Sequence, residues 1–470
     1  MMVDNFWSKS LNSPKFIVGP MVDQSELPFR LLCRSYEAQL CYTPMFHAGI
    51  FVKDPKYRKE NFVNCENDRP LIVQFCANDP DTFLEAAKLV EPYCDAVDLN
   101  LGCPQTIAKR GHYGAFLEDE WDLLKSMISK VSKELTIPVT CKIRIFQDID
   151  KTIRYAQMLE QAGCSMIAVH GRVKEQKGVL TGVANWKYIK AIKESVKIPV
   201  IANGNIQSLD DVNRCLKETG VEGIMSAEGV LHNPALFSAI HPPVWKVAEE
   251  YLKLVEQYPV VLSIVRGHLF KFFHISLSIE ENADLRHLLA KASARPQLHE
   301  FVRLMKERYQ EKLELDDLDF HVPMTTLPLP PYLCQPHFRP SPPLNKPTGS
   351  EETSKKRPIE NDSETSKTKR LANEARLQAK KAAKEASGRK LPLCTSCPNP
   401  RGVKCDYNLC KTCCRNKVFK LVLDCVGHKL MFKTRKRLAE EKEAIKTKER
   451  STNLNQQSTI NNSSTVLTCE

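Results

Sequence analysis

The sequence of 470 residues lacks long apolar runs and nucleotide-binding glycine motifs. No stretch approaches the ~20 apolar residues that a membrane-spanning helix needs, so we expect no membrane association. The first fifteen residues lack the charged-then-apolar pattern of a secretion signal, and we therefore expect a cytoplasmic protein. No G-x-G-x-x-G or Walker sequence follows a candidate strand, which argues against a doubly wound nucleotide-binding sheet.

Positive charge is concentrated toward the C-terminal end. Residues 339–450 hold 29 Lys and Arg against 13 Asp and Glu, whereas the rest of the chain holds 39 against 43. Such a segment is typical of a polyanion-binding appendage, but also of a disordered tail that needs charge to stay in solution. Its basic clusters at 355–358 and 367–370 would suit nuclear import signals, so a nuclear location as well stays open.

Eight short runs rich in apolar and β-branched residues predict strands. They cover residues 16–22, 39–46, 70–76, 96–102, 139–145, 166–172, 200–205 and 223–229. Most are nearly continuous apolar stretches, as strands buried on both faces require. Amphipathic helical stretches lie between most of them, at 80–91, 121–135, 152–162, 186–195 and 209–219. This alternation predicts a TIM (β/α)8 barrel.

The rest of the chain divides by composition. Val244, Ala248, Tyr251 and Val255 repeat at helical spacing, and similar patterns further on predict three or four helices. The expected order is a catalytic barrel (1–232), a helical domain (233–320), a Pro-rich then charged disordered linker (321–390), a basic Cys-rich zinc-binding module (391–437) and a disordered tail (438–470).

Polar residues and glycines gather where the predicted strands end. They are Gln74, Asn100, Cys103, Lys142, His170, Asn203 and Gly204. Barrel enzymes place their chemistry at this end of the barrel, so the pattern predicts an active site. Free cysteines are most often small buried hydrophobes, but Cys103 follows a strand end in Asn-Leu-Gly-Cys-Pro. With a reference pKa of ~8.5 the thiol is mostly protonated at neutral pH, and we predict a general acid.

Basic residues and glycine loops at the same end predict a phosphorylated cofactor. Lys142 and Arg144 alternate along one strand and so share a face. An inward lysine is costly without a partner, which favours an anionic or electron-rich ligand. The last two strands end in Asn203-Gly204-Asn205 and Ala227-Glu228-Gly229, in loops that often supply phosphate-binding amides.

Over residues 16–320 the sequence resembles the tRNA-dihydrouridine synthases. The motifs that carry the resemblance are Pro20-Met-Val, Gln74, Asn100-Leu-Gly-Cys-Pro, Lys142, Arg144, His170-Gly-Arg, Asn203-Gly-Asn and Asn233-Pro. The fuller strings at 20–27 and 103–115 are similar to the eukaryotic branch that modifies D-loop positions 16 and 17. The resemblance implies an FMN enzyme that is reduced by NAD(P)H and acts on tRNA, which the helical domain grips.

The resemblance also implies roles for residues. Hydride from reduced FMN would go to C6 of a uracil, with a proton from Cys103 to C5. FMN would be held by Pro20, Met21, Val22, Gln74, Asn100, Lys142, His170, Asn203, Gly204, Asn205, Ala227 and Glu228. Arg144 and Arg172 would contact the substrate, and we expect a monomer. Many relatives carry an arginine where this chain has Glu228, which leaves the side-chain contacts of that loop open.

Eight candidate metal ligands lie within 35 residues of the C-terminal region. They are Cys394, Cys397, Cys405, Cys410, Cys413, Cys414, Cys425 and His428. Paired C-x2-C units and a terminal C-x2-H unit are typical of structural zinc sites, and eight ligands suit two tetrahedral ions. Spacing does not decide which ligand serves which ion. The module is expected to contact either RNA or protein.

Two alternative functions remain. A flavin enzyme acting on a free pyrimidine or small enone would use the same barrel, but a small substrate has no use for a basic appendage. A catalytically inactive RNA-binding adaptor would retain the appendage, but it would have no need of Cys103, Lys142 and His170 together. The leading prediction is therefore an active tRNA-dihydrouridine synthase.

Overall fold

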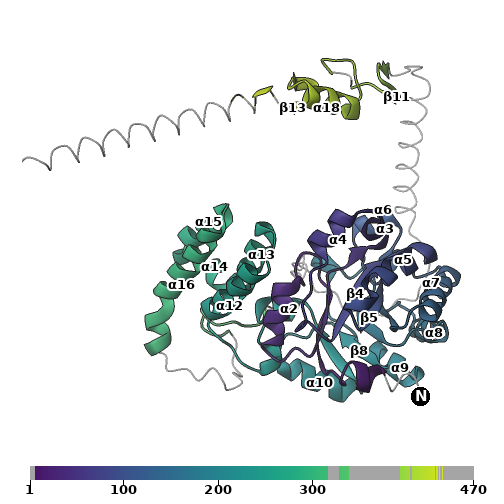
Figure 1. The fold of residues 1–470 in the computed structure, drawn as a ribbon. Helices are drawn as coiled ribbons and strands as arrows, with labels where there is room; N and C mark the ends of the chain where they lie inside the picture. The colour runs from purple at the N-terminus through teal and green to yellow at the C-terminus, as the bar shows by residue number, and fades with distance from the viewer. Residues whose placement is uncertain are drawn as a thin grey trace, which may run out of the picture. The chain divides into compact units, whose positions relative to one another are not determined.

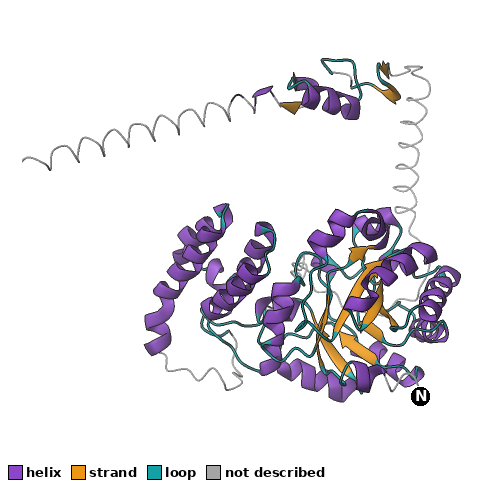
Figure 2. Cartoon of the chain, viewed as in Figure 1, coloured by secondary structure: helices purple, strands orange, loops and turns teal. Residues whose placement is uncertain are grey.

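The structure, a computed structural model, describes residues 6–315, 328–337, 392–402, 405–428, 430–431, 433–434 and 437. These residues belong to two compact units, one within Met1–Thr348 and the other within Gly349–Glu470. In the first unit a bundle of parallel strands is surrounded by helices (Figures 1 and 2). Both candidate nuclear import clusters and the predicted C-terminal tail lie outside the described residues.

The strands of the first unit form a closed parallel barrel. Their order is β2-β1-β9-β8-β7-β6-β5-β4-β3, and β2 also pairs with β4, which closes the ring. The strands are β1 (Phe16–Val18), β2 (Leu40–Tyr42), β3 (Phe46–His47), β4 (Leu71–Cys76), β5 (Ala96–Leu101), β6 (Val139–Arg144), β7 (Ile167–His170), β8 (Val200–Asn203) and β9 (Gly223–Ser226). The predicted TIM barrel is confirmed.

The run predicted as one strand at 39–46 is two short strands. β2 ends at Tyr42 and β3 begins at Phe46, with Pro44 between them. Proline has no N–H to donate to a neighbouring strand, so the ladder is interrupted there. β3 pairs with the last residues of β4, His47 opposite Cys76, and so extends the wall at the mouth of the barrel.

Helices cover the outside of the barrel. They are α2 (Leu27–Arg34), α3 (Ala48–Lys53), α4 (Pro55–Asn61), α5 (Pro80–Val90), α6 (Thr106–Gly111), α7 (Trp121–Glu134), α8 (Ile149–Gln161), α9 (Trp186–Ser195), α10 (Leu209–Thr219) and α11 (Glu228–His232). Single turns also occur at η1 (Phe6–Ser10), η2 (Glu91–Tyr93), η3 (Gly114–Phe116), η4 (Gly178–Leu180) and η5 (Leu236–Ser238). Helices α9 and α10 have the predicted bounds, whereas α8 begins three residues before the predicted 152. There the Asp148 side chain caps the helix by accepting the N–H of Asp150 at 2.8 Å.

A helical region follows the barrel. It contains α12 (Val244–Gln257), α13 (Leu262–Phe272), α14 (His274–Ser278), η6 (Glu280–Asn282), α15 (Ala283–Lys291) and α16 (Arg295–Leu315). Helix α12 packs against α2 of the barrel, where Glu26 accepts hydrogen bonds from Tyr251 at 2.6 Å and from His268 at 3.0 Å. This mostly buried network ties the helical region to the barrel.

Residues 328–337, which the sequence assigned to the linker, pack on the helical region. Leu333 forms a bridge with Pro243, and the N–H of Cys334 donates to the carbonyl of Pro242 at 2.9 Å. Tyr332, Leu333 and Cys334 are buried. A proline-rich composition does not reveal such packing, because the few apolar side chains between the prolines are sufficient to anchor the segment.

The second unit is small and rich in cysteine. A hairpin of β10 (Leu393–Cys394) and β11 (Cys397–Pro400) precedes α18 (Lys411–Lys420), η7 (Val426–His428) and a pairing of β12 (Asp424–Cys425) with β13 (Leu430–Met431). Among the described residues of this unit, the buried cluster consists of cysteines together with Leu409 and Val418. So small an apolar core does not stabilise a fold by itself.

Candidate functional site

The predicted site residues of the barrel meet at the end where its strands terminate. Asn100 Nδ2 donates to Gln74 Oε1 at 2.8 Å, and Lys142 Nζ donates to Asn203 Oδ1 at 3.1 Å. The strand register places His170 opposite Asn203. Five side chains from five strands thus form one polar cluster inside the mouth of the barrel.

Two buried residues that the sequence pattern did not single out extend this cluster inward. Asp98 on β5 accepts hydrogen bonds from Thr140 Oγ1 at 2.6 Å and from Gln74 Nε2 at 2.8 Å. Asp98 and Asn100 alternate on the same strand and therefore share a face. That alternation, Asp-x-Asn within an apolar run, was the signal by which Asp98 could have been found.

Cys103 lies on the loop after β5, and this loop is fixed on both sides. The N–H of Cys103 donates to Asn100 Oδ1 at 2.9 Å, and its carbonyl accepts the N–H of Ala115 at 3.2 Å. Gly114 has a φ of +66°, and a Cβ there would lie 2.8 Å from the Cys103 carbonyl oxygen. The thiol is half-buried beside Tyr113 and Cys76. The loop therefore presents one partly accessible thiol in a set position.

Lys142 is a half-buried cation whose described side-chain partner is an amide. Burial, and then the positive charge of Arg144, lowers the pKa of Lys142 to about 8. Within the part of the chain that the structure describes, no carboxylate forms an ion pair with it. A desolvated cation in such surroundings is stabilised by an electron-rich or anionic ligand.

His170 is a neutral histidine next to an arginine. Arg172 Nη1 donates to His170 Nε2 at 2.9 Å, which leaves Nδ1 as the protonated nitrogen. Burial, and then the charges of Lys142 and Arg144, lowers the pKa of His170 well below its ordinary value. His170 therefore offers a neutral N–H donor at the mouth of the barrel.

The two arginines predicted to contact substrate also hold loops. Arg144 Nε donates to the carbonyl of Gly102 at 2.8 Å and its Nη1 to that of Val173 at 3.0 Å. Arg172 Nη2 donates to the carbonyl of Gly182 at 3.0 Å and to Asn205 Oδ1 at 2.7 Å. Both guanidinium groups thus brace the loops around the mouth, and their contact with a substrate stays a prediction.

The loops predicted to hold a phosphate are constrained in conformation at Gly204 and Asn205. Gly204 has a φ of +114°, and a Cβ there would lie 2.7 Å from that of Ala184 and 3.0 Å from His170 Cδ2. Asn205 Oδ1 accepts the N–H of Ala184 at 2.6 Å, so this side chain ties two loops together. Half-buried Ala227 and Glu228 stand at the start of α11.

The remaining predicted cofactor contacts lie in the loop after β1. Pro20 and Met21 are half-buried, whereas Val22 is 57% exposed. The N–H of Met21 donates to Ser25 Oγ at 3.0 Å, and this bond shapes the turn before α2. The three residues follow the carboxyl end of β1, and their contact with a cofactor stays a prediction.

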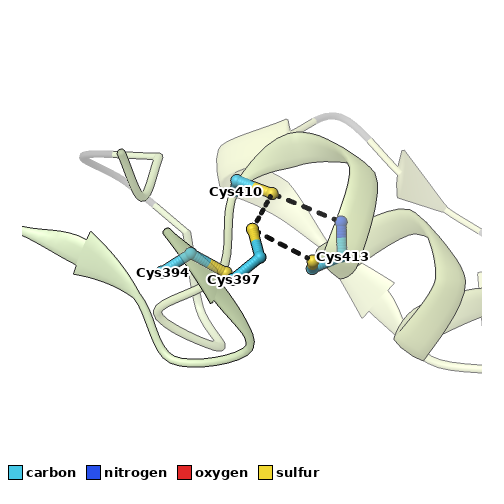
Figure 3. Close-up of side chains that lie close together, drawn as sticks. All are labelled: Cys394, Cys397, Cys410 and Cys413. Carbon is cyan, nitrogen blue, oxygen red and sulfur yellow. Dashed lines mark hydrogen bonds between the residues drawn. The ribbon is translucent and has the colours of Figure 1, made fainter. Parts of the chain in front are cut away.

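The eight predicted metal ligands divide into two groups of four. The ligand atoms within each group all lie within 4.8 Å of one another: Cys394, Cys397, Cys410 and Cys413 form one, and Cys405, Cys414, Cys425 and His428 the other. Figure 3 shows the sulfur atoms of the first group converging from the β10–β11 hairpin and the start of α18. The groups interleave along the chain, which is the pairing that spacing left open.

The geometry of both groups fits tetrahedral zinc. Zn–S bonds of about 2.3 Å imply S···S separations near 3.7 Å in a tetrahedron. Cys397 Sγ lies 3.6 Å from the sulfurs of Cys410 and Cys413, and Cys425 Sγ lies 3.7 Å from His428 Nδ1. A Cβ on Gly402 would overlap the His428 ring, so only glycine allows this approach.

Known proteins resemble this chain along most of its length. Residues 17–316 match the family described as Dihydrouridine synthase (Dus). A mouse protein named tRNA-dihydrouridine(16/17) synthase (NAD(P)+)-like is 51% identical over 438 residues, which cover 92% of this chain and 90% of the relative. A match of that length necessarily continues past residue 316 into the second unit.

Other relatives match a smaller share of the chain. The tRNA-dihydrouridine(16/17) synthase of Schizosaccharomyces pombe is 44% identical over 334 residues, 67% of this chain and 83% of the relative. A human protein named tRNA-dihydrouridine(20a/20b) synthase-like is 43% identical over 225 residues, 47% of this chain and 70% of the relative. No helix in the described part of the chain is long and apolar enough to cross a membrane.

Proposed function

Because this chain belongs to the dihydrouridine synthase family, we propose that its barrel mouth binds FMN beside a tRNA uridine and that Cys103 donates the proton. The chain is an NAD(P)H-dependent oxidoreductase, a tRNA-dihydrouridine synthase of the type named for positions 16 and 17. Reduction of the uracil C5–C6 double bond requires hydride on one carbon and a proton on the other.

Hydrogen-bond donors at the mouth of the barrel support the binding of a flavin, the cofactor type that this family uses in general. Lys142 uses one of its three N–H groups to donate a hydrogen bond to Asn203. His170 has its proton on Nδ1 and can donate a hydrogen bond from that atom. These donors suit the carbonyl and nitrogen acceptors along the edge of an isoalloxazine ring. Backbone amides of 203–205 and 227–228 would receive the phosphate, and the loop at 20–22 would contact the ring.

Cys103 carries the acid chemistry of this proposal. When bound, reduced FMN supplies hydride to C6 of the uracil. The Cys103 thiol gives its proton to C5 and takes another from solvent afterwards. Asn100 and Ala115 hold the backbone of Cys103 in place, so the thiol does not have to be positioned during the reaction.

The structure gives less support to the alternative functions. An inactive adaptor does not require a thiol loop held on both sides, or a half-buried lysine whose described side-chain partner is an amide. A reductase of small pyrimidines or enones does not require a basic second unit. For tRNA, that unit and the helical region would supply phosphate contacts that offset the cost of unstacking the uridine.

We also propose that the two cysteine groups each bind a zinc ion. N–H groups already donate to the sulfurs: Ser396 to Cys394 at 3.4 Å and Leu409 to Cys405 at 3.4 Å. Such bonds stabilise thiolates, the form that binds zinc. Metal analysis of the full chain should find about two zinc ions, and Cys413→Ser should lose metal whereas the barrel variant Cys65→Ser should not.

The anchored thiol of Cys103, at the same end of the barrel as Lys142, is the observation that carries the proposed function. The purified protein should be yellow, and uridines 16 and 17 of tRNA from cells lacking this protein should remain unreduced. Addition of the protein, FMN and NADPH to that tRNA should restore dihydrouridine there. A colourless protein that cannot be reconstituted with FMN would instead favour the adaptor. Fractionation of cells should find the protein in the cytoplasm, with any nuclear share lost when residues 355–370 are deleted.

A further inference from the structure

A buried carboxylate lies beneath the proton-donor loop and has no part in the chemistry above. Asp98, in the middle of β5, is 0% exposed. Its oxygens accept hydrogen bonds from Thr140 and Gln74, and within the described residues no cation forms an ion pair with it. Burial of a carboxylate is costly, so a residue that only filled space here would be apolar.

Asp98 starts a directional chain of hydrogen bonds that ends at Cys103. Gln74 Nε2 donates a hydrogen bond to Asp98. The Oε1 atom of Gln74 therefore faces the other way, where it accepts a hydrogen bond from Asn100 Nδ2 at 2.8 Å. Because the Nδ2 group of Asn100 donates to Gln74, its Oδ1 points toward the loop. This oxygen accepts hydrogen bonds from the N–H of Gly102 at 3.2 Å and from the N–H of Cys103 at 2.9 Å. Each link fixes the orientation of the next.

The direction of this chain follows from the chemistry of Asp98. An ionised carboxylate has acceptors only, so the nitrogen of Gln74 must point toward it. An asparagine at 98 could donate to Gln74 instead and reverse both amides. Asn100 would then turn its own N–H groups toward the N–H groups of Gly102 and Cys103, and the loop would lose its anchor. Thr140 supports the present direction because its hydroxyl donates to Asp98.

We propose that Asp98 is a positioning residue that orients Gln74 and Asn100 and thereby holds the Cys103 loop. The proposal rests on the proposed function, since it concerns the acid of that reaction. Gln74 is also a predicted flavin contact, so the same carboxylate orders the cofactor subsite and the acid together. In this proposal Asp98 does not touch either reactant. It acts through its partner Gln74 and, through Gln74, on Asn100.

The charge state that this role requires is available at neutral pH. Burial raises the pKa of Asp98 to about 6, against the hydrogen bonds of Thr140 and Gln74 and the charge of Lys142, which lower it. The carboxyl group is therefore mostly ionised at pH 7 and serves as an acceptor on both oxygens.

Asp98→Asn in the full-length protein tests the proposal by thiol accessibility. Alkylation of Cys103 and of Cys65, which is also half-buried, is followed in the same sample by peptide mass spectrometry. Release of the loop should raise the Cys103 to Cys65 rate ratio by about threefold or more, as local opening does. The kcat for dihydrouridine should fall about tenfold or more while KM for tRNA is retained.

Asp68→Asn is the matched control, because Asp68 is equally buried but pairs with Arg30 at 2.6 Å away from the Cys103 loop. It should lower the melting temperature and leave the alkylation rate of Cys103 unchanged. The Cys103 rate itself is compared for this variant, because the N–H of Asp68 donates to the carbonyl of the reference residue Cys65 at 3.0 Å. Thr140→Val removes one donor to Asp98 and should shift the ratio in the direction of Asp98→Asn, by less. It decides the matter if Asp98→Asn does not fold.

The positioning role is overturned if the Cys103 to Cys65 ratio is unchanged in Asp98→Asn. If Asp98→Asn does not fold, an unchanged ratio in Thr140→Val overturns it. So does an equal rise in the Cys103 alkylation rate in Asp68→Asn, because the effect would then follow stability alone. The ratio requires neither tRNA nor turnover. A shifted ratio in a protein that never reduces tRNA would refute the proposed function and leave the role of Asp98 in the loop intact.

Discussion

At the scale of single residues, Cys103 separates the two halves of the reaction. Cys103→Ala should leave flavin reduction by NAD(P)H intact, because the thiol takes no part in it. Base reduction should slow by about 10²–10⁴-fold, the usual contribution of a general acid. Stopped-flow absorbance measures the first rate, and dihydrouridine mapping measures the second.

Cys76→Ala provides the matched control for this substitution. Cys76 lies next to Cys103, and burial together with that neighbour raises the pKa of its thiol to about 12. It should retain base reduction. Equal losses in both variants would show that packing, and not proton donation, is disturbed; unaltered dihydrouridine formation in Cys103→Ala would remove the thiol from the mechanism.

Lys142 gives the free enzyme a pH dependence in flavin binding. Its pKa is lowered to about 8, so the cation is present below pH 8 and is lost as the pH rises through that value. FMN affinity of the apoprotein should therefore fall above pH 8, about two pH units earlier than for an ordinary lysine. Lys142→Met should bind FMN more weakly and without this change between pH 7 and 9, as fluorescence titration would show.

Residue types and spacing predicted the members of the barrel cluster but not their partners. Strand-end position identified Gln74, Asn100 and Lys142, because polar residues in buried strands are rare. Sequence could not indicate that Arg144 and Arg172 brace loops, since their carbonyl partners carry no residue identity. Asp98 was missed because it stands in the middle of β5, three residues before the strand ends at Leu101, among apolar neighbours.

At the scale of elements, the loop after β8 depends on one glycine. Gly204→Ala places a Cβ 2.7 Å from that of Ala184 in a backbone conformation that L-residues rarely adopt. The variant should lose more than about 1 kcal/mol of unfolding free energy and bind FMN more weakly, because His170 must also move. Denaturant unfolding and flavin titration measure the two effects.

Gly267→Ala is the control for Gly204→Ala, because here the added Cβ should stabilise the protein. Gly267 lies within α13, and a Cβ there meets nothing within 4 Å. Alanine should stabilise this helix by about 0.5–1 kcal/mol without altering FMN binding. Stabilisation by both substitutions would refute the strain assigned to Gly204.

The periodicity of apolar residues predicted which helices and strands form better than it predicted where they begin and end. All eight strand runs and helices α9 and α10 were predicted, because a barrel buries continuous apolar runs between amphipathic helices. The early start of α8 depends on the cap at Asp148, and the break between β2 and β3 depends on Pro44. The packing of 328–337 depends on contacts with residues distant in sequence, which local composition does not reveal.

At the scale of the whole molecule, the basic second unit should determine how salt affects tRNA binding. Deletion of 349–470 removes 27 Lys and Arg against 14 Asp and Glu, and with them the net positive charge of the chain. Affinity for tRNA at low salt should therefore fall. Every tRNA phosphate that the shortened protein no longer neutralises reduces the slope of log K against log salt by about 0.7–0.9. Deletion of the tail 438–470 alone is the control. Binding assays from about 50 to 200 mM salt would reject the role of this unit if all three proteins gave one slope.

The interleaving of the two metal-ligand groups restricts how the second unit can arise or be lost. One group spans 394–413 and the other 405–428. A chain break or frameshift anywhere from 394 to 428 therefore disrupts at least one group, and a break between 405 and 413 disrupts both. Only a piece of the chain that contains all of 394–428 can therefore carry both groups into another protein.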